Sequence, residues 1–175
     1  MNDLECRFNT PGAIEARTSR FDGEYNNFEE RDEEAWEIMD ALIRRAKTQG
    51  LPADENAELA DKSASGCTYR VPIGKRALKH LGRGTTAIPW LGELRVDADD
   101  TVFGDGPCWR AYFTDLRHET TPGNERDEVL MASVRLKGEN GYKRKEQDKH
   151  IRDAVDAARR WCRDNPPFIC REAHR

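Results

Sequence analysis

The sequence predicts an α+β fold in which a small antiparallel sheet of three to four strands has helices packed on one face. Three observations support this prediction. Apolar residues recur every three or four positions in two long segments, the period of a helix with one buried face. Between these segments, three short stretches alternate apolar and polar residues, as half-buried strands do. Their connections are too short for crossover helices, so consecutive strands are expected to pair antiparallel.

The first long helix is expected from Asn27 to Thr48. Acidic residues crowd its first turns and basic residues its last, which complements the helix dipole, and Gly50 and Pro52 end it. The second is expected from Lys143 to Asp164, ended by Pro166–Pro167. Shorter elements are a strand over 4–8, a loop over 13–27, a linker or short helix over 51–66 and a helix over 73–81.

The three strand candidates span 88–96, 108–113 and 129–136. In the second, Trp109, Ala111 and Phe113 are expected on one face and Arg110 and Tyr112 on the other. In the third, strict alternation places Leu130, Ala132, Val134 and Leu136 opposite Met131, Ser133 and Arg135. Both long helices are expected on the face of Trp109, Phe113, Leu130 and Val134.

Composition points to one domain with a thin core, since 37% of the 175 residues are hydrophobic and 35% are charged. No apolar run is long enough to span a membrane, and the N-terminus lacks the pattern of a signal peptide, so a cytoplasmic location is expected. The five cysteines are scattered and form no C-x-x-C pair. We expect buried, reduced thiols and no zinc ribbon or disulfide framework.

The charge is unevenly distributed. Residues 1–65 carry 8 Lys/Arg and 16 Asp/Glu, whereas residues 66–175 carry 21 and 17. We therefore distinguish an acidic N-terminal segment with a long helix, expected to belong to the same domain, from the remainder, which holds the sheet and the C-terminal helix. The basic part could meet phosphate, or both parts could simply be solvated surfaces.

The face opposite the expected core collects cations. It holds Arg95, Arg110, Tyr112 and Arg135, with Lys137 just beyond the last strand. Arginine forks and an aromatic ring suit a phosphodiester backbone and a stacked base. The alternative is an exposed face with cross-strand salt bridges, to which Glu93 could contribute.

Several short motifs accompany this face: Leu81-Gly82-Arg83-Gly84 followed by Gly92-Glu93-Leu94-Arg95, then Trp109-Arg110-Ala111-Tyr112-Phe113, Val129 to Lys137, and Tyr142-Lys143-Arg144-Lys145 before the last helix. Together with the element order, they resemble the RelE/HigB-like toxin superfamily over residues 75–162. The resemblance implies a toxin-like endoribonuclease that cuts messenger RNA, commonly on the ribosome, without a metal or cofactor, or an inactive descendant of such an enzyme.

The resemblance also implies roles for individual residues. Arg95, Arg110 and Arg135 would stabilise the phosphate, Lys137 or Lys143 would transfer protons, and Tyr142 or Tyr112 would stack on or orient a base, with Lys145 among the RNA contacts. No histidine is required, and His80, His118, His150 and His174 are interpreted as ordinary surface or boundary residues.

Two further functions remain open. One is a non-catalytic module that binds a protein or nucleic acid, such as a phage-encoded inhibitor or a toxin–antitoxin component whose partner is an antitoxin or host protein. The acidic N-terminal third supports it, because negative segments can imitate nucleic acid. The other is an unrelated enzyme or structural protein, although the sequence holds no phosphate-loop, dinucleotide, zinc-protease or serine-hydrolase motif.

Overall fold

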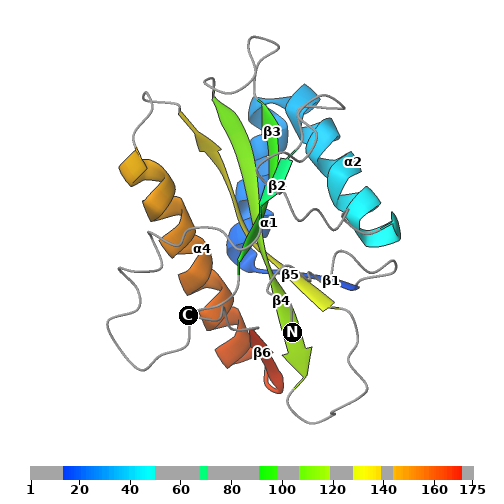
Figure 1. Ribbon diagram of the computed structural model, residues 1–175, viewed down its shortest axis with the longest axis vertical. Helices are drawn as coiled ribbons and strands as arrows, with labels where there is room; N and C mark the ends of the chain where they lie inside the picture. Colours follow the sequence, from blue (N-terminus) through cyan, green and yellow to red (C-terminus); the bar gives the residue numbers. More distant parts are fainter. Residues whose placement is uncertain are drawn as a thin grey trace.

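The computed structural model describes residues 14–49, 68–70, 91–97, 107–118, 128–138 and 144–170. The expected strand over 4–8, the linker over 51–66 and the helix over 73–81 lie outside them. The elements are β1 (Ile14–Arg17), α1 (Ser19–Arg31), α2 (Glu33–Gln49), β2 (Thr68–Arg70), β3 (Gly92–Asp97), β4 (Cys108–His118), β5 (Glu128–Lys137), α4 (Arg144–Asp164) and β6 (Phe168–Cys170), shown in Figure 1. No helix of this part of the chain is both long and apolar enough to cross a membrane.

The α+β class with a small sheet is confirmed. The strands lie in the order β1-β5-β4-β3-β2, and β6 pairs with the C-terminal end of β4. The central strands β3, β4 and β5 form the expected antiparallel meander, whereas β1 runs parallel to β5. The sheet has more strands than the three to four expected, because β1, β2 and β6 are only three or four residues long and too short to show a period.

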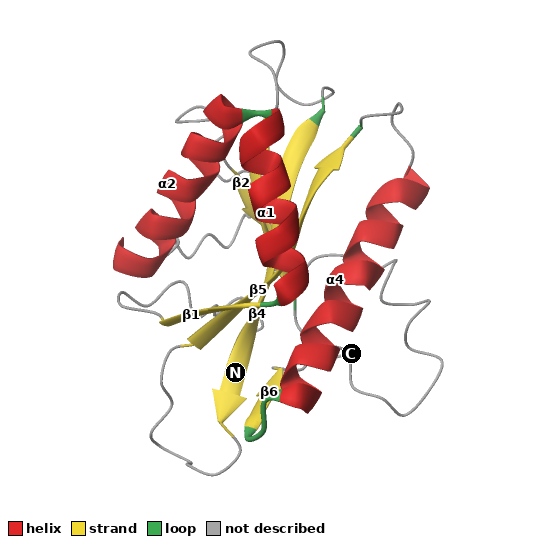
Figure 2. Cartoon of the chain, turned by 180° about the vertical axis from the view of Figure 1, so that it is seen from behind, coloured by secondary structure: helices red, strands yellow, loops and turns green. Residues whose placement is uncertain are grey.

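Helices cover both faces of the sheet, which corrects the expectation of one covered face. The helices α1 and α2 pack on the face of Trp109 and Phe113, and Figure 2 shows α1 lying across the strands with α2 beside it. The helix α4 packs on the other face, where Ile151, Ala154, Val155 and Ala158 meet Tyr112, Leu116, Leu130 and Ala132. The sheet therefore has two apolar faces over part of its area, although the sequence pattern suggested one.

A β-bulge in β5 explains why strict alternation was the wrong expectation. Tyr112 pairs with Ser133, but the next residue, Phe113, pairs with Met131, so Ala132 is an extra residue. One extra residue in a strand moves every side chain beyond it to the opposite face of the sheet from the one that strict alternation predicts. Val129 and Met131 before the bulge thus share a core with Val134 after it, while Leu130 and Ala132 face α4.

Where a loop over 13–27 and a single helix over 27–48 were expected, the structure has β1 and then two helices, α1 and α2, with a break at Asp32. The backbone of Asp32 is not helical (φ −157°, ψ 73°). Its carboxylate accepts a hydrogen bond from the Ala35 amide (3.2 Å), which caps α2, and another from the indole N–H of Trp109 (2.9 Å). The sequence did not predict this break, because several acidic residues precede Trp36 and nothing in the sequence distinguishes Asp32 from the others. The C-terminal helix, in contrast, was predicted within one residue.

Candidate functional site

The three arginines predicted from the sequence lie side by side on the α4 face of the sheet. Arg95 of β3 pairs with Arg110 of β4, which pairs in turn with Arg135 of β5. Their common face follows from the strand alternation, and the antiparallel register places them in one row. The structure therefore brings these three residues together, but their environments differ.

Arg110 is held in a buried ion pair. Its Nη1 atom lies 2.7 and 2.8 Å from the two carboxylate oxygens of Glu93, and the side chains are only 7% and 5% exposed. Its Nε–H also points to the sulfur of Cys108, 3.4 Å away. Burial lowers the pKa of Arg110, but Glu93, Cys108 and Tyr112 together outweigh this effect, so the pKa lies above its usual value. In this conformation Arg110 cannot reach a phosphate in solvent.

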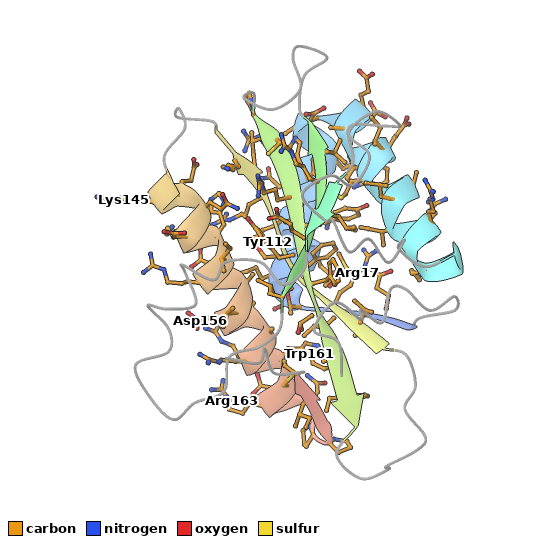
Figure 3. The ribbon with its side chains drawn as sticks, in the orientation of Figure 1. Arg17, Tyr112, Lys145, Asp156, Trp161 and Arg163 are labelled. Atoms are coloured by element: carbon orange, nitrogen blue, oxygen red, sulfur yellow. The ribbon has the colours of Figure 1, made fainter. Side chains whose placement is uncertain are left out.

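Tyr112 is also withdrawn from solvent. It is fully buried (0% exposed), within the apolar cluster below α4. Figure 3 shows it in the middle of the sheet, far from Lys145 at the beginning of α4. Its hydroxyl has no hydrogen-bond partner in the described part of the chain, and burial raises its pKa well above the usual value. Its ring supports the core and is not open to a base.

Arg135 lies at the boundary between α1, β5 and α4. Its side chain is 32% exposed, and its guanidinium is 3.5 Å from both Glu24 of α1 and Asp153 of α4. Arg20 contacts the same two carboxylates at 3.3 and 3.5 Å. These four residues form a charge network that joins the two helices beside β5. Because its contacts are longer than the 2.7–2.9 Å of a strong charged pair, Arg135 is held more weakly than Arg110.

The network lies where β5 loses its neighbour in the sheet. β1 pairs with β5 only as far as Met131. Beyond it, the Thr18 hydroxyl donates to the carbonyl of Ala132 (2.7 Å), and the carboxylate of Glu24 accepts from the Ser133 hydroxyl (2.6 Å) and the Val134 amide (2.9 Å). The side chains of Thr18, which caps α1, and of Glu24 thus replace part of a missing strand, and α1 is held along this edge.

A pocket of about 160 Å³ opens at this edge. We call it the edge pocket. It lies between α1, the end of β5 and the first turns of α4. Its residues are Glu24, Asn27 and Arg31 from α1, Trp109, Val134, Arg135 and Leu136 from the sheet, and Glu146 and His150 from α4. The guanidinium of Arg31 lies over the Trp109 ring, 5.6 Å from its centre.

His150 is the functional candidate that sequence reasoning missed. It is 7% exposed, and its Nδ1 atom has no hydrogen-bond partner among the described residues. Burial, then the charge of Arg135, lowers its pKa below the usual value, so the imidazole is neutral at pH 7. A signal was present: Glu146, His150 and Asp153 are spaced to share one face of the last helix.

The remaining predicted residues that the structure describes do not line the edge pocket. Lys137 donates to the side chain of Gln147 (2.9 Å), and burial, then Arg110, lowers its pKa. Arg95 is half-buried and Lys145 is exposed on the first turn of α4. Tyr142 and Lys143 lie outside the described residues. Within the described ranges, no three His, Cys, Asp or Glu side chains are grouped so as to hold a metal ion.

The edge pocket therefore combines a neutral imidazole, two guanidinium groups, two carboxylates and an indole ring. Such a set can bind an anion and move a proton. Comparison with family models, with curated proteins and with solved structures finds no match for this chain.

Proposed function

We propose that the protein is a toxin-like, metal-independent endoribonuclease that acts on messenger RNA, with the edge pocket as its catalytic centre. One observation carries the proposal: His150, whose Nδ1 is buried and without a hydrogen-bond partner among the described residues, lines the same pocket as Arg135. Cleavage of RNA through its 2′-OH needs a base near neutral pH and positive charge on the phosphate. The resemblance of residues 75–162 to the RelE/HigB-like superfamily supports the same reaction.

The reaction assigns one step to each group. His150 removes the proton from a ribose 2′-OH, and the resulting oxygen attacks the adjacent phosphorus. Arg135 and Arg31 stabilise the charge on the phosphate. Lys137, whose pKa is lowered and which lies two residues after Arg135 on the same strand, donates a proton to the leaving 5′-oxygen. The products are a 2′,3′-cyclic phosphate and a 5′-hydroxyl, and solvent exchange restores both protonation states.

The weak pairing of Arg135 fits this role. Its contacts with Glu24 and Asp153 are 3.5 Å long, so a phosphate oxygen can replace a carboxylate at small cost. Arg110, in contrast, makes two short contacts with one carboxylate and is buried. We therefore assign phosphate binding to Arg135 and a structural role to Arg110.

The test uses purified protein and a defined single-stranded RNA, with a chelator present. Wild type should release fragments that end in a 2′,3′-cyclic phosphate. His150→Gln should lower the rate about 10²–10⁴-fold and Arg135→Gln about 10²–10³-fold. Arg152→Gln is the matched control, because Arg152 is exposed on the same helix and lies outside the pocket. If both pocket variants cleave as fast as this control, the pocket is not the catalytic centre.

A non-catalytic binding module is the second candidate. The burial of Arg110 and Tyr112 favours it, because the resemblance assigns phosphate and base contacts to these two side chains and both are withdrawn from solvent. This candidate predicts that wild type leaves RNA intact while retaining salt-dependent binding to RNA or to a protein partner. Arg135→Gln should then weaken binding, and no cyclic phosphate should appear.

A further inference from the structure

Two cysteines that are eight positions apart in the sequence meet at the end of α4. Cys162 lies in its last turn and Cys170 in β6, and their sulfur atoms are 2.6 Å apart. Neither side chain is fully buried, in contrast to Cys108, which is 0% exposed. Thiols at this separation need little backbone movement to become bonded.

The segment between them holds both cysteines in place. β6 pairs antiparallel with β4, with Cys170 opposite Leu116. The Phe168 ring packs against Trp161, with 5.6 Å between the ring centres, and Trp161 lies near the end of α4 in Figure 3. The side chain of Asn165 donates to the carbonyl of Trp161 (2.8 Å), and the Phe168 amide donates to the carbonyl of Asn165 (3.0 Å). The pairing of β6 with β4 and the contacts between α4 and β6 thus hold the two sulfur atoms close together.

We propose that Cys162 and Cys170 form a reversible disulfide by exchange with a low-molecular-weight disulfide. The Cys162 thiolate attacks one sulfur of the small disulfide, whose S–S bond breaks and releases one small thiolate. The Cys170 thiolate then attacks the Cys162 sulfur and releases the second. Two protein thiols lose two electrons and two protons, and two small thiols are formed.

The environment favours Cys162 as the attacking group. The hydrogen bond from the Cys170 thiol stabilises the Cys162 thiolate and lowers the pKa of Cys162, while the same hydrogen bond raises the pKa of Cys170. The bond would tie the end of α4 to β6, and through β6 to β4. It is independent of the edge pocket, so it stands whether or not the protein cleaves RNA.

The test incubates the folded protein with mixtures of reduced and oxidised glutathione, then alkylates free thiols and maps the peptides by mass spectrometry. We expect a peptide pair joined through Cys162 and Cys170, and a free Cys108 once the protein is unfolded in the alkylating reagent. Closing this short loop should raise the midpoint of thermal unfolding by roughly 5–10 °C. Reduction with dithiothreitol should reverse both changes.

The single variants make the result specific. Cys170→Ser should stop the reaction at a mixed disulfide on Cys162 and abolish the thermal shift, whereas Cys108→Ala should retain both the cross-link and the shift. If either variant fails to fold, the relative alkylation rates of Cys162 and Cys170 in the native wild type provide the second measurement, with Cys162 expected to react first. Separate mixed disulfides on both cysteines, or two free thiols under oxidising mixtures, would overturn the proposal.

Discussion

Replacing Arg110 by methionine tests the structural role that the geometry gives to this residue. The change leaves the carboxylate of Glu93, only 5% exposed, without the guanidinium that contacts both its oxygens at 2.7 and 2.8 Å. Removing one partner of a buried ion pair costs about 3–5 kcal/mol, because the remaining charge stays desolvated. For a chain of this length, that loss lowers the melting temperature by roughly 6–20 °C.

A double-mutant cycle separates the pair from the individual side chains. Urea unfolding should show a loss of about 3–5 kcal/mol for Arg110→Met and a similar loss for Glu93→Leu, while the double variant should lose much less than their sum. Arg95→Met is the matched control, since Arg95 is the half-buried neighbour of Arg110 in the same row, and it should cost about 1 kcal/mol or less. Single losses below about 1 kcal/mol at Glu93 and Arg110 would refute the reasoning.

The same double variant distinguishes stability from catalysis. If Arg110 acts only through Glu93, the folded double variant should cleave RNA at close to the wild-type rate. If the double variant folds but does not cleave RNA, Arg110 takes part in catalysis, as the resemblance implies.

Two further predictions concern stability. Because burial and Arg135 lower the pKa of His150 in the fold, the unfolded chain binds more protons just below pH 6.5, so stability should fall as pH drops from 7 through this window. Gly92→Ala should cost about 1–3 kcal/mol in denaturant unfolding, because the new Cβ would lie within 2.9 Å of three ring carbons of Phe113. Gly23→Ala, with open space around it in α1, should stabilise by about 0.5–1 kcal/mol, and equal effects at the two glycines would show that the close approach of Phe113 is wrong.

The sequence alone determined the elements whose signal is local. The last helix follows from its apolar stripe and from Pro166–Pro167, and the structure places it at Arg144–Asp164. The pairing of β4 with β5 follows from two alternating stretches joined by a short connection. The row of Arg95, Arg110 and Arg135 follows from the same alternation, because period and strand order together place equivalent positions side by side.

Only the tertiary structure decided which of these groups meet solvent and which meet one another. The bulge at Ala132 depends on the partner strand, so no period within β5 reveals it. Asp32 divides two helices because Trp109, 77 residues away, donates to it. The edge pocket unites residues from Glu24 to His150, and Cys162 meets Cys170 because β6 turns back onto β4. Periodicity reports how one segment faces its surroundings, whereas burial, pKa and reactivity depend on the segments that surround it.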